Sequence, residues 1–192
     1  KEWADFSCGL TKEEFDSFNQ IILKSKVYNG WFTEDNVRNA IGGICSMLTK
    51  EELERWLGTY SIIDANKTVG VIMAGNIPMV GFHDLLCVLI SGNKITAKPS
   101  SEDNLLLPAI VNMLKTIEPR FETRIQFVPK LNEFDAVIAT GSDNSARYFK
   151  SYFGKYPHII RKSRNGVGVL HGDESAAQLH ELGKDIFTYF GL

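Results

Sequence analysis

Beyond residue 68 the chain alternates short apolar runs with longer stretches of helical periodicity, and this alternation restricts the fold more than any other feature. Strands are expected over residues 69–74, 94–97, 125–128, 136–139, 158–161 and 167–170. Helices are expected over residues 80–90, 104–117, 142–153 and 174–190. Such alternation is typical of βαβ units, which build a parallel sheet flanked by helices. We therefore predict an α/β fold with a Rossmann-like parallel sheet.

The residues before position 60 have a different, purely helical pattern. Thr11, Thr33 and Thr49 each stand where a helix N-cap is expected, and Glu14 and Glu52 complete capping-box patterns at the first and third. We therefore expect two parts: a helical N-terminal segment over residues 1–60, packed on the body, and a nucleotide-binding α/β domain over residues 61–192.

Two adjacent glycines, Gly42 and Gly43, fall inside the second expected helix. A glycine in a helix interior costs about 1 kcal/mol relative to alanine. Two explanations stay open at this point: another element packs closely against the glycines, or the helix frays there.

The composition excludes several classes of protein. The 192 residues are 44% hydrophobic and 23% charged, so the chain can form a sizeable core and is not disordered as a whole. Lys and Arg (21) nearly balance Asp and Glu (23), which argues against a nucleic-acid-binding protein. Cys8, Cys45 and Cys87 lack the spacing of a disulfide framework or a zinc site, so we expect a cytoplasmic protein without a bound metal. The most apolar stretch, residues 80–90, is shorter than the roughly 20 residues of a membrane span.

Three polar motifs directly follow expected strands. In chain order they are Gly75-Asn76-Ile77-Pro78, Lys98-Pro99-Ser100 and Thr140-Gly141-Ser142. In an open parallel sheet, ligands bind at the carboxyl ends of the strands. These motifs are therefore the candidate binding and catalytic residues.

Each motif has a functional and a structural interpretation. Asn76 can donate to a carbonyl oxygen that becomes negative during a reaction, or it can cap the turn ahead of Pro78. Lys98 can bind a ribose or a phosphate, or it can be a solvated loop lysine. Ser142 can meet a phosphate at a helix N-terminus, or it can be an ordinary N-cap. Residue spacing alone leaves all three pairs open.

Taken together, the motifs and their order resemble the coenzyme-binding half of the aldehyde dehydrogenase superfamily. In that superfamily a Trp-Asn-x-Pro turn, a Lys-Pro-Ser strand end and a Thr-Gly-Ser helix start follow one another. Residues 74–86, Ala-Gly-Asn-Ile-Pro-Met-Val-Gly-Phe-His-Asp-Leu-Leu, more closely resemble the acyl-CoA reductases of the bacterial bioluminescence (LuxC) type. The resemblance covers about residues 30–192 and implies an aldehyde-dehydrogenase-like fold.

The resemblance also implies a role for each motif. Asn76 matches the asparagine that stabilises the oxyanion of the thiohemiacetal, and Lys98 matches the lysine that binds the adenosine ribose. Ser142 matches the serine that meets the cofactor diphosphate at a helix N-terminus, where Gly141 lets the backbone approach the ligand.

The position three residues after Lys98 bears on the choice of cofactor. Members of the superfamily that use the unphosphorylated cofactor commonly carry a glutamate there, whereas this chain has Ser101. We therefore expect NADPH as the cofactor. Glu102 follows immediately, so a shift of the loop by one residue would return a carboxylate to the ribose.

The chain departs from the superfamily pattern in two places. Oxidising members carry a general-base glutamate in a region that corresponds to residues 159–165, which contain no carboxylate here. The family's nucleophilic cysteine follows the last helix of the coenzyme-binding half, so we expect it beyond Leu192. Cys8 and Cys45 precede the nucleotide fold, and Cys87 is expected on the apolar face of a helix as a core residue.

The resemblance therefore implies a fragment of an NADPH-dependent acyl-CoA reductase, which converts an acyl thioester to a fatty aldehyde through a cysteine acyl-enzyme. The fragment itself is expected to be inactive, and the complete enzyme takes acyl-CoA as its substrate and can form an oligomer. The alternative is a stand-alone, non-catalytic nucleotide-binding or regulatory module.

Overall fold

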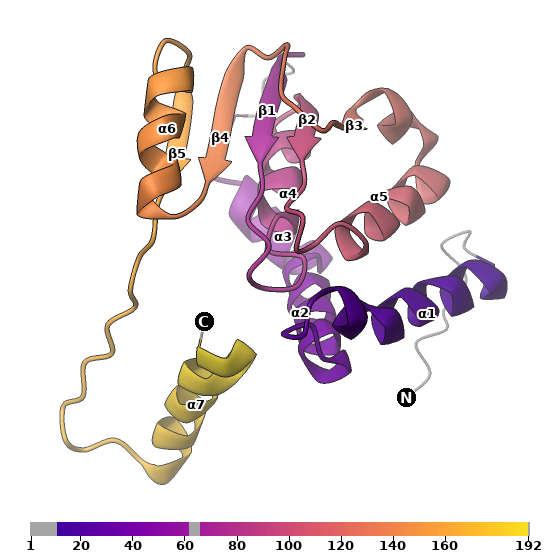
Figure 1. Ribbon diagram of the computed structural model, residues 1–192. Coiled ribbons are helices and arrows are strands. Elements are labelled where there is room, and N and C mark those ends of the chain that lie inside the picture. Colours follow the sequence, from indigo (N-terminus) through magenta and orange to yellow (C-terminus); the bar gives the residue numbers. More distant parts are fainter. Residues whose placement is uncertain (1–10, 62–65, 192) are drawn as a thin grey trace.

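The computed structural model describes residues 11–61 and 66–191 and has a five-stranded, all-parallel sheet at its centre (Figure 1). The strands lie in the order β3-β2-β1-β4-β5. Their bounds are β1 Thr68–Ile72, β2 Lys94–Lys98, β3 Ile125–Phe127, β4 Ala136–Thr140 and β5 His158–Arg161. The α/β fold with a Rossmann-like parallel sheet and a helical start is thus confirmed.

Helices precede the sheet and connect its strands. The α-helices are α1 Lys12–Tyr28, α2 Glu34–Met47, α3 Lys50–Leu57, α4 Phe82–Ile90, α5 Leu106–Ile117, α6 Asp143–Phe153 and α7 Ala176–Phe187. Two short 3₁₀ helices are η2 Pro119–Thr123 and η3 Thr188–Gly191. Thr11, Thr33 and Thr49 are the N-caps of the first three helices, as the sequence predicted. The reciprocal capping box forms at Thr11, whereas Thr49 makes only the cap hydrogen bond to Glu52 N–H.

Apolar cores form on both faces of the sheet. On one face Ile95 and Ala97 of β2 are buried together with Leu85 of α4 and Leu107 of α5. On the other face Val137 and Ala139 of β4 are buried against a smaller set of aromatic and aliphatic side chains, which includes Phe149 and Phe153 of α6. Alternate residues of a strand point to opposite faces, so β1 and β4 each contribute to both cores: Val71 and Ile138 belong to the first, Ile72 and Val137 to the second.

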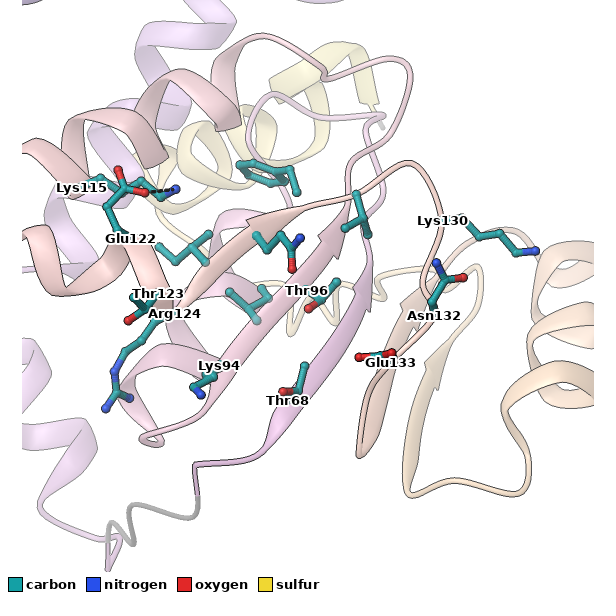
Figure 2. Close-up of a pocket in the computed structure, with 15 residues that line it drawn as sticks. Thr68, Lys94, Thr96, Lys115, Glu122, Thr123, Arg124, Lys130, Asn132 and Glu133 are labelled. Carbon is teal, nitrogen blue, oxygen red and sulfur yellow. Dashed lines mark hydrogen bonds and ion pairs between the residues drawn. The ribbon is translucent and has the colours of Figure 1, made fainter.

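The connection from β3 to β4 crosses the sheet without a helix. Residues 128–135 pass over β1, where Gly70 leaves room for them: a Cβ at Gly70 would lie 3.1 Å from Leu131 Cδ1 and 3.2 Å from Phe134 Cγ. This short crossing covers β1 but places no helix over β2 and β3, so that part of the face stays bare (Figure 2).

The N-terminal helices contact the part of the body that carries the candidate site. Asn29, at the C-terminus of α1, is buried; its Oδ1 accepts from Trp31 N–H at 3.0 Å and its Nδ2 donates to the carbonyl of Glu102 at 3.5 Å. Phe32 and Val37 belong to the main core beside α4 and α5. These contacts brace the loop that follows β2.

The prediction of a strand over residues 167–170 is wrong. This segment is extended but pairs with no other strand among the described residues, and Val167 and Val169 are 87% and 73% exposed. It follows β5 away from the sheet and leads to α7 (Figure 1). Apolar alternation gives a segment the side chains of a strand, but a strand also needs a neighbouring backbone with which to pair.

Neither explanation of the glycine pair in α2 agrees with the structure. A Cβ at Gly42 or Gly43 would meet nothing within 4 Å, so the close packing considered above is wrong. The helix continues through both residues to Met47, so it does not fray there either.

Candidate functional site

The three motifs lie on neighbouring strands at one edge of the sheet. β1 pairs with β2 on one side and with β4 on the other, and Ile72 is the register partner of both Lys98 and Ala139. The loops that follow these strands therefore leave the sheet side by side at its carboxyl edge. This edge includes the point between β1 and β4 where the strand order reverses, which is where open α/β sheets bind their ligands.

Asn76 is exposed on the turn that follows β1. Its side chain makes no hydrogen bond to any other described residue. The turn is closed instead by backbone hydrogen bonds, from Val80 N–H to Ile77 O (3.3 Å) and from Phe82 N–H to Met79 O (2.8 Å). The turn-capping interpretation of Asn76 is therefore wrong within the described chain, and its amide is available to a ligand.

A cavity of about 410 Å³ lies beside this turn, between the loops that follow β2 and β3. It is lined by Lys98, Pro99, Ser100, Ser101, Asn104, Phe127, Val128 and Pro129. The lining combines an apolar side, suited to a flat base, with hydroxyl, amide and ammonium groups suited to a ribose and its phosphates. No carboxylate of the described residues lies within ion-pair distance of the Lys98 ammonium. These residues fit the adenosine part of a nicotinamide cofactor.

Ser142 and Gly141 follow β4 on the other side of β1. Ser142 Oγ caps α6 by accepting from Ser145 N–H at 3.2 Å, so the structural interpretation of this serine holds in the free protein. Gly141 allows α6 to pack closely, because a Cβ there would lie 2.9 Å from Ser145 Cβ and 3.0 Å from Phe149 Cε2. The Gly141 N–H already donates to Arg161 O at 3.1 Å. The first turn of α6 nevertheless presents its N-terminus to the same edge.

A comparison with protein-family models decides the family. The model of the acyl-CoA reductase (LuxC) family matches residues 22–189, which is most of the chain. The chain belongs to the acyl-CoA reductase (LuxC) family. Its members carry out acyl-CoA reductase chemistry with a nicotinamide cofactor. A search of curated proteins found no match.

The described part of this LuxC-family chain has two cysteines, and neither resembles a reactive thiol at the site. Cys45 is exposed on α2. Cys87 lines a cavity together with Val69 and His158, at the amino ends of β1 and β5, opposite to the motif edge. Burial raises the pKa of the Cys87 thiol, and the nearby Asp84 carboxylate raises it further. A raised pKa disfavours the thiolate, which is the nucleophilic form. The expectation that Cys87 is a core residue holds only in part, because its side chain is half-buried. Cys8 lies outside the described residues.

His83 and Asp84, which are adjacent in sequence, point in different directions. His83 is exposed and stacks on Trp56 with a centroid separation of 6.3 Å. Asp84 is buried and its Oδ1 accepts from Arg161 Nη1 of β5 at 2.5 Å. They therefore do not form a catalytic pair, and Asp84 instead ties α4 to the edge strand of the sheet.

A second cavity, of about 740 Å³, lies over the bare face of β2 and β3 rather than at the motif edge (Figure 2). Its lining is polar and mixes charges of both signs; Lys115, for example, pairs with Glu122 at 3.0 Å. Phe127 and Val128 line both this cavity and the one beside Lys98, so the two are neighbours. None of Asn76, Gly141 and Ser142 lines it.

One residue beside the candidate site, Asp103, was not predicted from the sequence. Its carboxylate is buried in the loop between β2 and α5, and Oδ2 accepts from Met79 N–H at 2.7 Å. The run Ser-Ser-Glu-Asp-Asn before α5 indicates a helix N-cap, and in that sense Asp103 had a sequence signal. No sequence signal, however, indicated its contact with Met79, 24 residues earlier in the chain.

None of the helices in the described part of the chain is both long enough and apolar enough to span a bilayer.

Proposed function

We propose that this chain supplies the cofactor-binding part of an NADPH-dependent acyl-CoA reductase, which forms a fatty aldehyde through a cysteine acyl-enzyme. The observation that carries the proposal is the juxtaposition at one sheet edge of an unengaged amide, Asn76, with the cavity beside Lys98. The family match supports acyl-CoA reductase chemistry, and the residue roles are our assignment.

The proposed chemistry begins with attack of a cysteine thiolate on the thioester carbonyl. The carbonyl oxygen becomes negative as the C–S bond forms, and the Nδ2 group of Asn76 donates a hydrogen bond to it. The oxyanion then collapses, the bond to the CoA sulfur breaks, and CoA leaves as a thiolate. When bound, the nicotinamide cofactor supplies the hydride that reduces the acyl-enzyme to the aldehyde and frees the cysteine. One fixed donor of this kind contributes about 2.7–4 kcal/mol to lowering the barrier.

The absence of a carboxylate from residues 159–165 supports reduction rather than oxidation. An oxidising enzyme that hydrolyses its acyl-enzyme needs a base to activate water. In the corresponding segment here, Arg161 of β5 pairs with buried Asp84 instead. A reductase that starts from a thioester adds no water, so it does not need that base.

NADPH is the proposed cofactor because the loop after Lys98 offers a hydroxyl where a carboxylate would repel a 2′-phosphate. Ser101 is exposed at the rim of the cavity and Lys98 adds a positive charge to its lining. Lys98 and Ser101 would hold the adenosine ribose and its phosphate. Gly141 and Ser142, at the first turn of α6, would lie nearest the diphosphate.

The nucleophile is assigned to a cysteine outside these 192 residues, as the resemblance implies. Of the described cysteines, Cys87 lies at the amino ends of β1 and β5, and Cys45 is exposed on α2 rather than on a loop that follows a strand. The alternative function is a non-catalytic nucleotide-binding or regulatory module. In that case the cavity beside Lys98 would bind a nucleotide and Asn76 would have no chemical role.

The two functions are distinguished by an activity measurement. The protein that carries this chain in its natural context is mixed with a long-chain acyl-CoA and NADPH, and the loss of reduced-nicotinamide absorbance is followed while the aldehyde is trapped with a hydrazine. We expect one aldehyde per cofactor oxidised, and no turnover by residues 1–192 alone. Nucleotide binding without any aldehyde from the natural protein would favour the non-catalytic module.

A further inference from the structure

Asp103 is a buried carboxylate that joins two of the site loops. It is 5% exposed, and its Oδ2 accepts from the N–H of Met79 at 2.7 Å. Met79 ends the turn that carries Asn76 and has a φ of 57°, in the left-handed region that side chains other than glycine rarely adopt. Backbone in that region persists only where surrounding contacts hold it, and the Asp103 hydrogen bond is such a contact.

The backbone of Asp103 is also held in place, by contacts within its own loop and with Gly75. The Asp103 N–H donates to Ser100 O at 3.3 Å, and a Cβ at Gly75 would lie 3.2 Å from Asp103 N. Asp103 therefore touches the beginning of the turn through its backbone and the end of the turn through its carboxylate. Asn76 lies between these two points.

A carboxylate is a costly group to place here. Burial raises the pKa of Asp103, and the N–H groups of Met79, Leu107 and Leu106 offset this only in part. The N-cap of α5, Leu105, makes no side-chain cap hydrogen bond. One alternative role of Asp103 is therefore to cap α5 and nothing else. A cap for α5 would not, however, need to reach a backbone N–H in a different loop.

We propose that Asp103 is a positioning residue for acyl-CoA reduction: by holding Met79 N–H, it fixes the turn so that the Asn76 amide meets the oxyanion. This inference rests on the proposed function of Asn76. A donor contributes most when its position is set before the reaction, and a displacement of about 1 Å can cost about 100-fold in rate. Asp103 acts through Asn76 and touches neither substrate nor cofactor.

The test is a double-mutant cycle on the natural enzyme with Asp103→Leu, Asn76→Ala and the double variant. We expect Asp103→Leu to lower kcat by at least 30-fold, with KM for acyl-CoA changed by less than threefold. In the Asn76→Ala background the same substitution should lower kcat by less than threefold, because the donor that it positions is gone. Asp103→Asn, whose amide oxygen can still accept from Met79 N–H, should retain kcat within about fivefold.

Val111→Ala is the matched control, because it removes a buried apolar side chain from α5, the helix that follows the Asp103 loop, and leaves the hydrogen bond between Asp103 and Met79 in place. It should leave kcat within threefold. Amide exchange of Met79 in residues 1–192 provides a readout without turnover: it should accelerate at least 30-fold in Asp103→Leu and little in Val111→Ala. If Asp103→Leu does not fold, Asp103→Ser takes its place with the same criteria.

Additive losses in the cycle would overturn the positioning role while leaving the proposed function intact. So would unchanged exchange of Met79. A loss of less than tenfold in Asn76→Ala alone would instead remove the proposed oxyanion role, and the role of Asp103 with it.

Discussion

Gly75 lies directly against Ser100, so that the loop after β1 and the loop after β2 touch at a position where only hydrogen fits. A Cβ at Gly75 would come within 2.5 Å of both Cβ and Oγ of Ser100. Real Cβ atoms do not approach other heavy atoms so closely, so any larger residue at position 75 must push the loops apart. The two loops carry Asn76 and Lys98, and this contact sets the distance between them.

Gly75→Ala should therefore affect both stability and catalysis. We expect a loss of about 1–3 kcal/mol in the free energy of unfolding, which is typical of overpacking, and at least a tenfold loss of kcat/KM for acyl-CoA. Gly166→Ala is the control, because a Cβ at Gly166 would meet nothing within 4 Å. Urea unfolding and steady-state kinetics measure the two effects. Equal behaviour of the two variants would show that the loops move apart freely.

Cofactor selectivity should depend on position 101. A glutamate introduced by Ser101→Glu places a negative charge beside the expected 2′-phosphate, and two like charges 4 Å apart repel by about 4 kcal/mol at an effective dielectric of 20. We expect the NADPH:NADH affinity ratio to fall at least tenfold, measured by fluorescence titration at fixed salt because this repulsion is screened. Ser151→Glu, on exposed α6, adds the same charge elsewhere and should leave the ratio unchanged. A tenfold preference of the unmodified protein for NADH would reject the assignment of Ser101, and would point to Glu102 as the ribose acceptor.

The glycines of α2 offer a direct route to higher stability. Gly42→Ala and Gly43→Ala should each stabilise the protein by about 0.5–1 kcal/mol, because alanine is the better helix former and the added methyl group meets no neighbour. Chemical denaturation of residues 1–192 measures the change. A loss of stability in either variant would mean that another part of the protein packs against the glycines of α2 in solution.

Stability in acid should depend on Glu118. This carboxylate accepts from the guanidinium and then from the backbone N–H of Arg120, which lowers the pKa of Glu118 from 4.5 to about 2. A lowered pKa in the folded state stabilises the protein above pH 4.5, and this contribution is lost as the pH falls from 4.5 toward 2. The denaturation midpoint of Glu118→Gln should therefore lie below that of the unmodified protein at pH 6, and the two midpoints should converge near pH 2. A gap that stays constant across this range would show that the pair does not titrate as described.

The fold was largely predictable from the sequence because helix and strand periodicity are local properties. The alternation beyond residue 68 predicted the five strands that form, and cap residues predicted the starts of the first three helices. The segment at 167–170 has the same local pattern as a strand, and it differs only in having no partner backbone. Pairing depends on residues distant in sequence, so local pattern cannot report it.

The candidate site was predictable to the extent that its residues follow strands. Asn76, Lys98 and Ser142 were identified as strand-end residues, and the strand order then brings them to one edge. Contacts between loops were not predictable: the hydrogen bond from Met79 to Asp103 and that from Asn29 to Glu102 each join residues that are far apart in the chain. A single buried carboxylate has no periodicity, so its position is known only from the folded structure.

The proposed mechanism depends on Asn76 as the donor to the oxyanion that forms during thioester reduction. The kcat of Asn76→Ala for acyl-CoA reduction is therefore the decisive measurement. Asn112→Ala, an exposed asparagine on α5, is the matched control and should keep full activity. We expect a loss of 100- to 1000-fold in kcat for Asn76→Ala, the usual contribution of one oxyanion donor, with cofactor affinity unchanged. A loss of less than tenfold would contradict it, because an amide so easily removed cannot be the donor on which the reaction depends.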